Sequence, residues 1–188
     1  MIKLEKKESI YFLTMDAGEN RWNTTFVREI SKALDTIEDD EGPGALITSA
    51  TDSKFFSNGL DLNWMQAPED YPDGGDREVF GEEFMYLMGR FITLPIPTIC
   101  ALNVHTFGAG FMFALSHDFR IMREDRGFLC ANEMQLGLPI PRPELALFKH
   151  KIPANAFFET VQLSKRWTGT DALKAGIVQE VSSFEELS

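Results

Sequence analysis

The sequence has few of the residues that build metal sites, disulfides or membrane spans. It contains two cysteines and three histidines in 188 residues, without the Cys and His spacing of a zinc site. Cys100 and Cys130 each lie in an apolar stretch, which favours buried free thiols over a disulfide. No run of 18 apolar residues occurs, and the charged start MIKLEKKES lacks the apolar core of a signal peptide. We therefore expect no metal, no membrane span and a location inside the cell, in the cytoplasm.

Positive charge is also scarce. The chain has 18 Lys and Arg against 29 Asp and Glu, a formal net charge of −11. A nucleic-acid groove needs a face rich in Lys and Arg, so nucleic acid is not an expected partner. The composition, 44% hydrophobic and 12% aromatic, is that of a globular chain. Because this length suits one sizeable core, residues 1–188 are predicted to form a single domain.

Apolar spacing and turn residues predict alternating strands and helices. Strands are expected at residues 9–15, 45–49, 119–122, 127–131 and 177–181. Helices are expected at residues 24–39, 79–93, 157–163 and 170–175, with a further helix opening at Pro143 and a short one within residues 54–65. The Pro, Gly and Asp residues of 66–76 indicate a mobile acidic loop. The order strand, strand, helix recurs, which is typical of α/β or α+β layering.

Residues 98–118, TICALNVHTFGAGFMFALSHD, are the centre of this organisation. They predict an apolar strand, a glycine-containing turn and a helix that is apolar on all sides and therefore buried. The first N–H groups of a buried helix need acceptors. If the chain supplies none, a ligand oxygen with negative charge suits that position. Ser116, His117 and Asp118 cannot converge as a catalytic triad, because helix neighbours point in different directions; a role for His117 at the helix end, where its charge would suit the dipole, is expected instead.

Two glycine turns, Ser57-Asn58-Gly59-Leu60 and Phe107-Gly108-Ala109-Gly110, each follow a strand and precede a helix. Either turn alone is more often a simple connection between a strand and a helix, without a role in function. Together with ANEMQLGLP and ALKAGIVQEV, in this order and spacing, they resemble the enoyl-CoA hydratase/isomerase (crotonase) superfamily over nearly the whole chain. The motifs are most similar to the Δ3,Δ2-enoyl-CoA isomerases, with the peroxisomal plant type as the nearest subgroup. The resemblance implies an α/β fold, a crotonase-like spiral of repeated ββα units.

The resemblance also implies a site for an acyl-CoA thioester. An oxyanion hole would consist of the backbone amides of Leu60 and Ala109, which stabilise the enolate formed when the thioester loses an α-proton. Met65, Trp64, Met112 and Phe84 are candidates for an apolar acyl tunnel, although such residues are more often plain core. The remaining expected substrate-binding residues are Ser57, Gly59, Asp61, Gly108, Gly110, Met112, Arg21 and Lys54, the last two as partners for the coenzyme A phosphates.

Glu133 is the expected catalytic residue. A glutamate seen alone is usually on the surface, but the NE-x-QLG motif of the resembled family implies a carboxylate beside the thioester. Hydratases of that family carry a second glutamate where this sequence has Met112. A 1,3-proton shift needs one base, whereas adding water needs two groups, so the sequence favours an isomerase that moves a 3-enoyl-CoA double bond to the 2-trans position.

Several alternatives stay open. One alternative is an enoyl-CoA hydratase or another acyl-CoA thioester enzyme, and the other is a non-catalytic CoA-binding family member. The resemblance implies no cofactor beyond the coenzyme A of the substrate, and a homotrimer or dimer of trimers. The family normally continues for several helices beyond IVQEV, so we expect the C-terminal helical part to be absent here. Any peroxisomal location would depend on a C-terminal signal that SFEELS does not supply.

Overall fold

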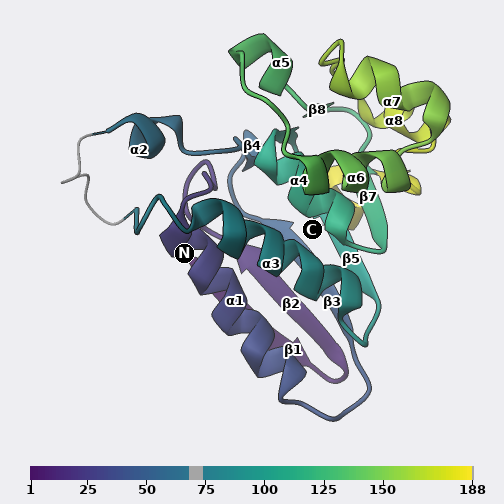
Figure 1. Cartoon of the computed structure of the whole chain (residues 1–188). Coiled ribbons are helices and arrows are strands. Elements are labelled where there is room, and N and C mark those ends of the chain that lie inside the picture. Colours follow the sequence, from purple (N-terminus) through teal and green to yellow (C-terminus); the bar gives the residue numbers. More distant parts are fainter. Residues whose placement is uncertain (68–73, 188) are drawn as a thin grey trace.

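A six-stranded sheet forms the body of the protein (Figure 1). The computed structural model describes residues 1–67 and 74–187, so most of the predicted loop at 66–76 lies outside the described residues. The sheet order is β1-β2-β3-β5-β7-β9, with β1 antiparallel to β2 and the other neighbours parallel. Its strands are β1 (Ile2–Lys7), β2 (Ile10–Met15), β3 (Ala45–Ala50), β5 (Thr98–Leu102), β7 (Phe119–Arg123) and β9 (Glu180–Ser182).

A second, smaller sheet contains three parallel strands, β4 (Phe55–Ser57), β6 (His105–Phe107) and β8 (Leu129–Cys130). Each of them follows a strand of the large sheet and precedes a helix. The chain therefore repeats a strand of the large sheet, a strand of the small sheet and a helix, which confirms the predicted spiral of ββα units. Since β4, β6 and β8 are parallel, the turns that follow them meet at one edge of the small sheet.

The helices cover the sheets and close the core. Helices α1 (Thr24–Glu38) and α3 (Phe80–Thr93) pack against each other across one face of the large sheet (Figure 1). Every residue of α4 (Ala109–Ser116) is buried, as its unbroken apolar sequence predicts. The Asn23 side chain accepts a hydrogen bond from the Phe26 amide at 2.9 Å and so caps α1. The other helices are α2 (Leu62–Gln66), α5 (Glu133–Leu136), α6 (Arg142–Lys151), α7 (Ala154–Val161), α8 (Gly169–Lys174) and α9 (Phe184–Leu187).

The end of α4 is fixed by His117. This side chain is fully buried; Nδ1–H donates to the Phe113 carbonyl at 2.9 Å, and Nε2 accepts from the Thr48 hydroxyl at 2.9 Å. The predicted place at the helix end is confirmed, but the predicted reason is wrong. Burial lowers the pKa of His117 to about 3, so the imidazole is neutral and joins α4 to β3 by hydrogen bonds instead of by its charge.

The observed elements differ from the predicted ones at a few places. The strand β1 was not predicted, because this edge strand is mostly exposed and charged. The closing strand is Glu180–Ser182, not residues 177–181, since Ile177 and Val178 are buried in the turn after α8. Cys100 and Cys130 are buried free thiols, as predicted. In the part of the chain that the structure describes, no helix is both long and apolar enough to cross a membrane.

Candidate active site

Three turns meet at the carboxyl edge of the small sheet. Gly59 follows β4 with φ +78°, and a Cβ atom there would lie 3.0 Å from the Phe107 carbonyl oxygen at the end of β6. Gly108 follows β6 with φ +49°, and a Cβ there would lie 2.9 Å from Oε1 of Glu133, which follows β8. Both glycines are thus required by backbone conformation and by close approach. The order of the parallel strands brings the two glycine turns and Glu133 into contact.

The amides of Leu60 and Ala109 lie at these turns. Among the residues that the structure describes, neither amide donates a hydrogen bond to a protein acceptor. Ala109 is the first residue of α4, where an N–H group has no partner within the helix. Both residues line one cavity of about 360 Å³. These two unpartnered amides can donate hydrogen bonds to an oxygen that carries negative charge.

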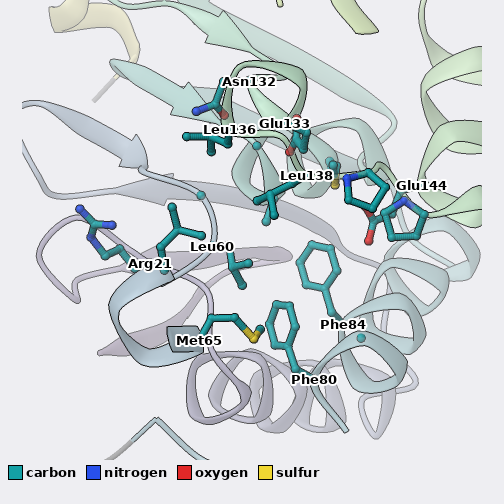
Figure 2. A pocket seen from close by; sticks show the side chains of 18 of the residues that line it. Arg21, Leu60, Met65, Phe80, Phe84, Asn132, Glu133, Leu136, Leu138 and Glu144 are labelled. Carbon is teal, nitrogen blue, oxygen red and sulfur yellow. The ribbon is translucent and has the colours of Figure 1, made fainter. Parts of the chain in front are cut away.

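The cavity is mainly apolar (Figure 2). Met65, Phe84 and Met112 line it, as the predicted acyl tunnel requires. Trp64 does not: it is buried, and its indole N–H donates to the Gly75 carbonyl at 3.1 Å. The remaining apolar lining residues include Leu62, Phe80, Leu136, Leu138, Pro139 and Pro141. Such a cavity suits a hydrocarbon chain that leads away from one polar group.

Glu133 is the first residue of α5 and lines the cavity (Figure 2). Only 9% of it is exposed, and Oε2 is buried without a hydrogen-bond partner in the described part of the chain. Burial raises the pKa of this carboxyl group, because desolvation disfavours its charged form. A raised pKa brings the group closer to the pH at which a carboxylate can both take and return a proton.

Glu144 is a second carboxylate on the same cavity, and the sequence patterns did not single it out. It lies in the first turn of α6 and is 8% exposed. Burial, followed by the negative charge of Glu133, raises the pKa of Glu144 to about 7. The only signal in the sequence is a glutamate directly after Pro-Arg-Pro, which predicts the start of a helix but does not show which way that start faces.

Arg21 and Lys54, the expected phosphate partners, occupy different places. Arg21 lines the cavity and pairs with Glu19, with 2.6 Å between the guanidinium and Oε2. Glu19 also accepts from the Asn58 side chain at 2.8 Å, so the Gly59 turn and Arg21 are tied together. Lys54 is exposed, with its ammonium 5.0 Å from the centre of the Phe55 ring, and is not among the lining residues.

Ser57, Asp61 and Gly110 lie behind the cavity and do not line it. Ser57 is fully buried; its hydroxyl donates to the Asn20 carbonyl at 2.7 Å and accepts from the Trp22 indole at 3.1 Å. Asp61 caps α2 by accepting a hydrogen bond from the Trp64 amide at 3.1 Å. Gly110 packs on Ser57. These three residues support the turns, and their contact with a substrate stays a prediction.

Comparison with known proteins agrees with this architecture. A sequence model of the enoyl-CoA hydratase/isomerase family matches residues 5–188. The chain belongs to this family. Among curated relatives, the peroxisomal enoyl-CoA delta isomerase 2 of Arabidopsis thaliana is 35% identical over 99% of this chain and 79% of its own length. The carnitinyl-CoA dehydratase of Shigella flexneri is 28% identical over 99% of this chain and 69% of its own.

Solved structures of the family share the fold. A probable enoyl-CoA hydratase of Mycobacterium tuberculosis H37Rv superposes with a TM-score of 0.88 at 24% identity, over 99% of this chain and 76% of that one. A second structure of the same mycobacterial protein, described there as an enoyl-CoA isomerase, superposes with a TM-score of 0.86, also at 24% identity, over 99% of this chain and 78% of that one. Because one protein of this fold is described both as a hydratase and as an isomerase, the fold leaves the reaction to be argued from the site.

Proposed function

We propose that this protein is a Δ3,Δ2-enoyl-CoA isomerase, which moves the double bond of a 3-enoyl-CoA to the 2-trans position. The observation that carries the proposal is the buried carboxyl group of Glu133 in contact with the Gly108 turn, beside two unpartnered amides and an apolar cavity. The 35% identity with an Arabidopsis enoyl-CoA delta isomerase supports it.

In this mechanism the thioester oxygen accepts hydrogen bonds from the amides of Leu60 and Ala109. Loss of the C2 proton turns the thioester into an enolate, whose negative charge lies on that oxygen. Each preorganised donor of this kind is worth about 10² to 10³ in rate. Small residues at the turn allow the carbonyl group to reach the backbone, and the methyl group of Ala109 narrows the approach without removing the amide.

Glu133 acts as the base that removes the C2 proton. The cavity places its carboxyl group among apolar side chains, where a raised pKa makes the return of the proton easier. Met112 lines the cavity from α4, at the position where hydratases of the family have their second glutamate. A thioether cannot hold or deliver a proton, so activation of a water molecule from this side is missing.

The test is to incubate the protein with a series of 3-enoyl-CoA thioesters and follow conjugation of the double bond by ultraviolet absorbance. Glu133→Gln keeps the shape and removes the base, so turnover should fall about 10²- to 10⁴-fold, the range for general acid–base groups. Binding of acyl-CoA, measured by thermal shift, should survive. The matched control is Glu82→Gln, an exposed glutamate in the first turn of α3, which should leave turnover unchanged.

Two results would contradict the proposal. One is full isomerase activity in Glu133→Gln. The other is a wild-type protein that hydrates 2-enoyl-CoA as fast as it isomerises 3-enoyl-CoA of the same chain length.

A further inference from the structure

Glu144 is a carboxyl group in the cavity that the mechanism above leaves without a task. It comes from α6, a ten-residue helix that packs on α4, whereas Glu133 comes from the turn after β8 (Figure 2). Both are at least nine-tenths buried. Within residues 1–67 and 74–187, no protein group donates a hydrogen bond to the Glu144 side chain, and its oxygens are not among the fully buried atoms that lack a partner. The carboxyl group is therefore accessible from the cavity that Glu144 lines and is available to a ligand there.

The charges around the cavity distinguish the two carboxyl groups. Among the described residues, the ionisable side chains that line it are Arg21, Glu133 and Glu144. Burial raises the pKa of both glutamates, and the charge of Glu133 raises that of Glu144 further, to about 7. Two interacting acids ionise in sequence, so one carboxyl group of the pair keeps its proton to a higher pH than the other. Two carboxyl groups on one cavity can therefore serve as a base and an acid together.

We propose that Glu144 is a second catalytic residue, which delivers a proton to C4 of the substrate after Glu133 has removed one from C2. This inference rests on the proposed isomerase function. The C2–H bond breaks and its proton passes to the Glu133 carboxylate, while the electron pair moves into a dienolate whose oxygen is held by the two amides. A C4–H bond then forms with the proton of Glu144, the double bond shifts to C2–C3, and the carbonyl group returns.

After one turnover Glu133 is protonated and Glu144 is ionised. Glu133 then gives its proton to water and Glu144 takes a proton from water, which restores the starting state, and no oxidant or reductant takes part. This route differs from a one-base route in the origin of the C4 hydrogen. With one base, that hydrogen comes from C2 of the same substrate molecule. With two residues, it comes from Glu144 and therefore from solvent.

The experiment follows the label and the rate together. Wild type, Glu144→Gln and Glu82→Gln are given 3-enoyl-CoA deuterated at C2 in ordinary water, and the deuterium at C4 of the product is measured by mass spectrometry. We expect little transfer of the label in wild type and in Glu82→Gln. In Glu144→Gln, turnover should fall about 10²-fold or more, and the C2 label should reach C4 in the product that still forms, because Glu133 then carries the proton alone.

The pH profile separates proton transfer from a structural role. If Glu144 works as an acid, wild-type kcat falls as pH rises above about 7, the pKa of Glu144. Glu144→Gln should lose this fall while its thermal stability and acyl-CoA binding persist.

Each result decides the matter. Wild-type turnover and wild-type label transfer in Glu144→Gln would overturn the role of Glu144 and leave the isomerase proposal intact. If Glu144→Gln loses hydration of 2-enoyl-CoA but keeps isomerisation, the proposed role of Glu144 in isomerisation is overturned too, because Glu144 would then act on water. A wild-type protein that does not isomerise any 3-enoyl-CoA would overturn both proposals. In that case wild type and Glu133→Gln would be equally inactive.

Discussion

The two sheets of this protein treat buried polar groups differently. Against the six-stranded sheet such groups are paired: the His117 ring bonds the Thr48 hydroxyl, and the buried Arg120 guanidinium donates to the carbonyls of Ile177 and His117 at 2.9 and 3.0 Å. At the carboxyl edge of the three-stranded sheet the buried Ser57 hydroxyl is paired, but the Oε2 atom of Glu133 is not. The amides of Leu60 and Ala109, two residues that line the cavity, also have no protein partner within the described residues.

The difference indicates a division of work within one repeating unit. Each ββα unit contributes a strand to the large sheet, which provides burial, and a strand to the small sheet, whose following turn faces the cavity. An unpaired buried polar group costs about 1 to 3 kcal/mol, so the unpaired Oε2 atom of Glu133 is tolerated only because the rest of the fold supports it. Changes to the large sheet should therefore alter stability, and changes to the small sheet should alter turnover.

The largest expected effect is a loss of stability when the core of the large sheet is changed. Leu46 in β3 is fully buried. Leu46→Ala should lower the free energy of unfolding by about 2 to 5 kcal/mol through lost burial and the cavity left behind, while kcat of the folded protein is kept. Urea unfolding and activity measured on the same samples check both parts. A fall of kcat to the level of Glu133→Gln would break the division.

The contact between α4 and β4 joins the two roles. A Cβ on Gly110 would lie 2.5 Å from the Ser57 Cβ, so Gly110→Ala should lower stability by about 1 to 3 kcal/mol through overpacking. It should also lower kcat, because Ala109 would move with it. The matched control is Gly89→Ala in α3, where nothing lies within 4 Å of the added atom; this change should stabilise the helix by about 0.5 to 1 kcal/mol. Equal stability of the two variants would contradict the tight packing.

The pH dependence of stability should have opposite signs in the two regions. The pKa of His117 falls from 6.5 to about 3 on folding, so its contribution is present above pH 6.5 and is lost as pH falls, by about 1.4 kcal/mol per unit. The pKa of Glu144 rises from 4.5 to about 7, so its contribution is present below pH 4.5 and is lost as pH rises.

Unfolding free energies of wild type, His117→Gln and Glu144→Gln between pH 5 and 6.5 check these signs. Relative to wild type, His117→Gln should become less destabilising as pH falls. Glu144→Gln should become more destabilising as pH falls. His150→Gln, at an exposed histidine, serves as the control and should leave the slope unchanged. Parallel slopes for all variants would show that neither group changes its protonation on folding as described.

The smallest expected effect is a gain of hydratase activity. Met112→Glu would place a carboxylate opposite Glu133, where it can help to activate water. The gain should be small, because burying a new charge costs stability. Met112→Gln, which is polar but carries no proton-transfer group, should show no gain. Hydration of 2-enoyl-CoA, measured for both variants, tests whether one position separates the two reactions of the family.

The sequence could predict much of the small-sheet edge, since its chemistry is local. Gly59 and Gly108 stand in turns that only glycine enters easily, and Glu133 belongs to a recognisable motif. Other features depend on tertiary contacts. Glu144 was missed because nothing near it in the chain shows that the start of α6 faces the cavity. The four-residue α5 is too short for a helical period, and β1 needs little apolar sequence because it is an edge strand.

The contact between Gly108 and Glu133 has a consequence for how related sequences can diverge. The backbone of one residue leaves no room for a side chain because the carboxyl group of the other lies against it. A side chain at position 108 would meet the Glu133 carboxyl group and also carry the strain of the positive φ. We therefore expect positions 108 and 133 to vary together in related sequences: a lineage that carries a side chain at 108 should carry a shorter acid, or none, at 133.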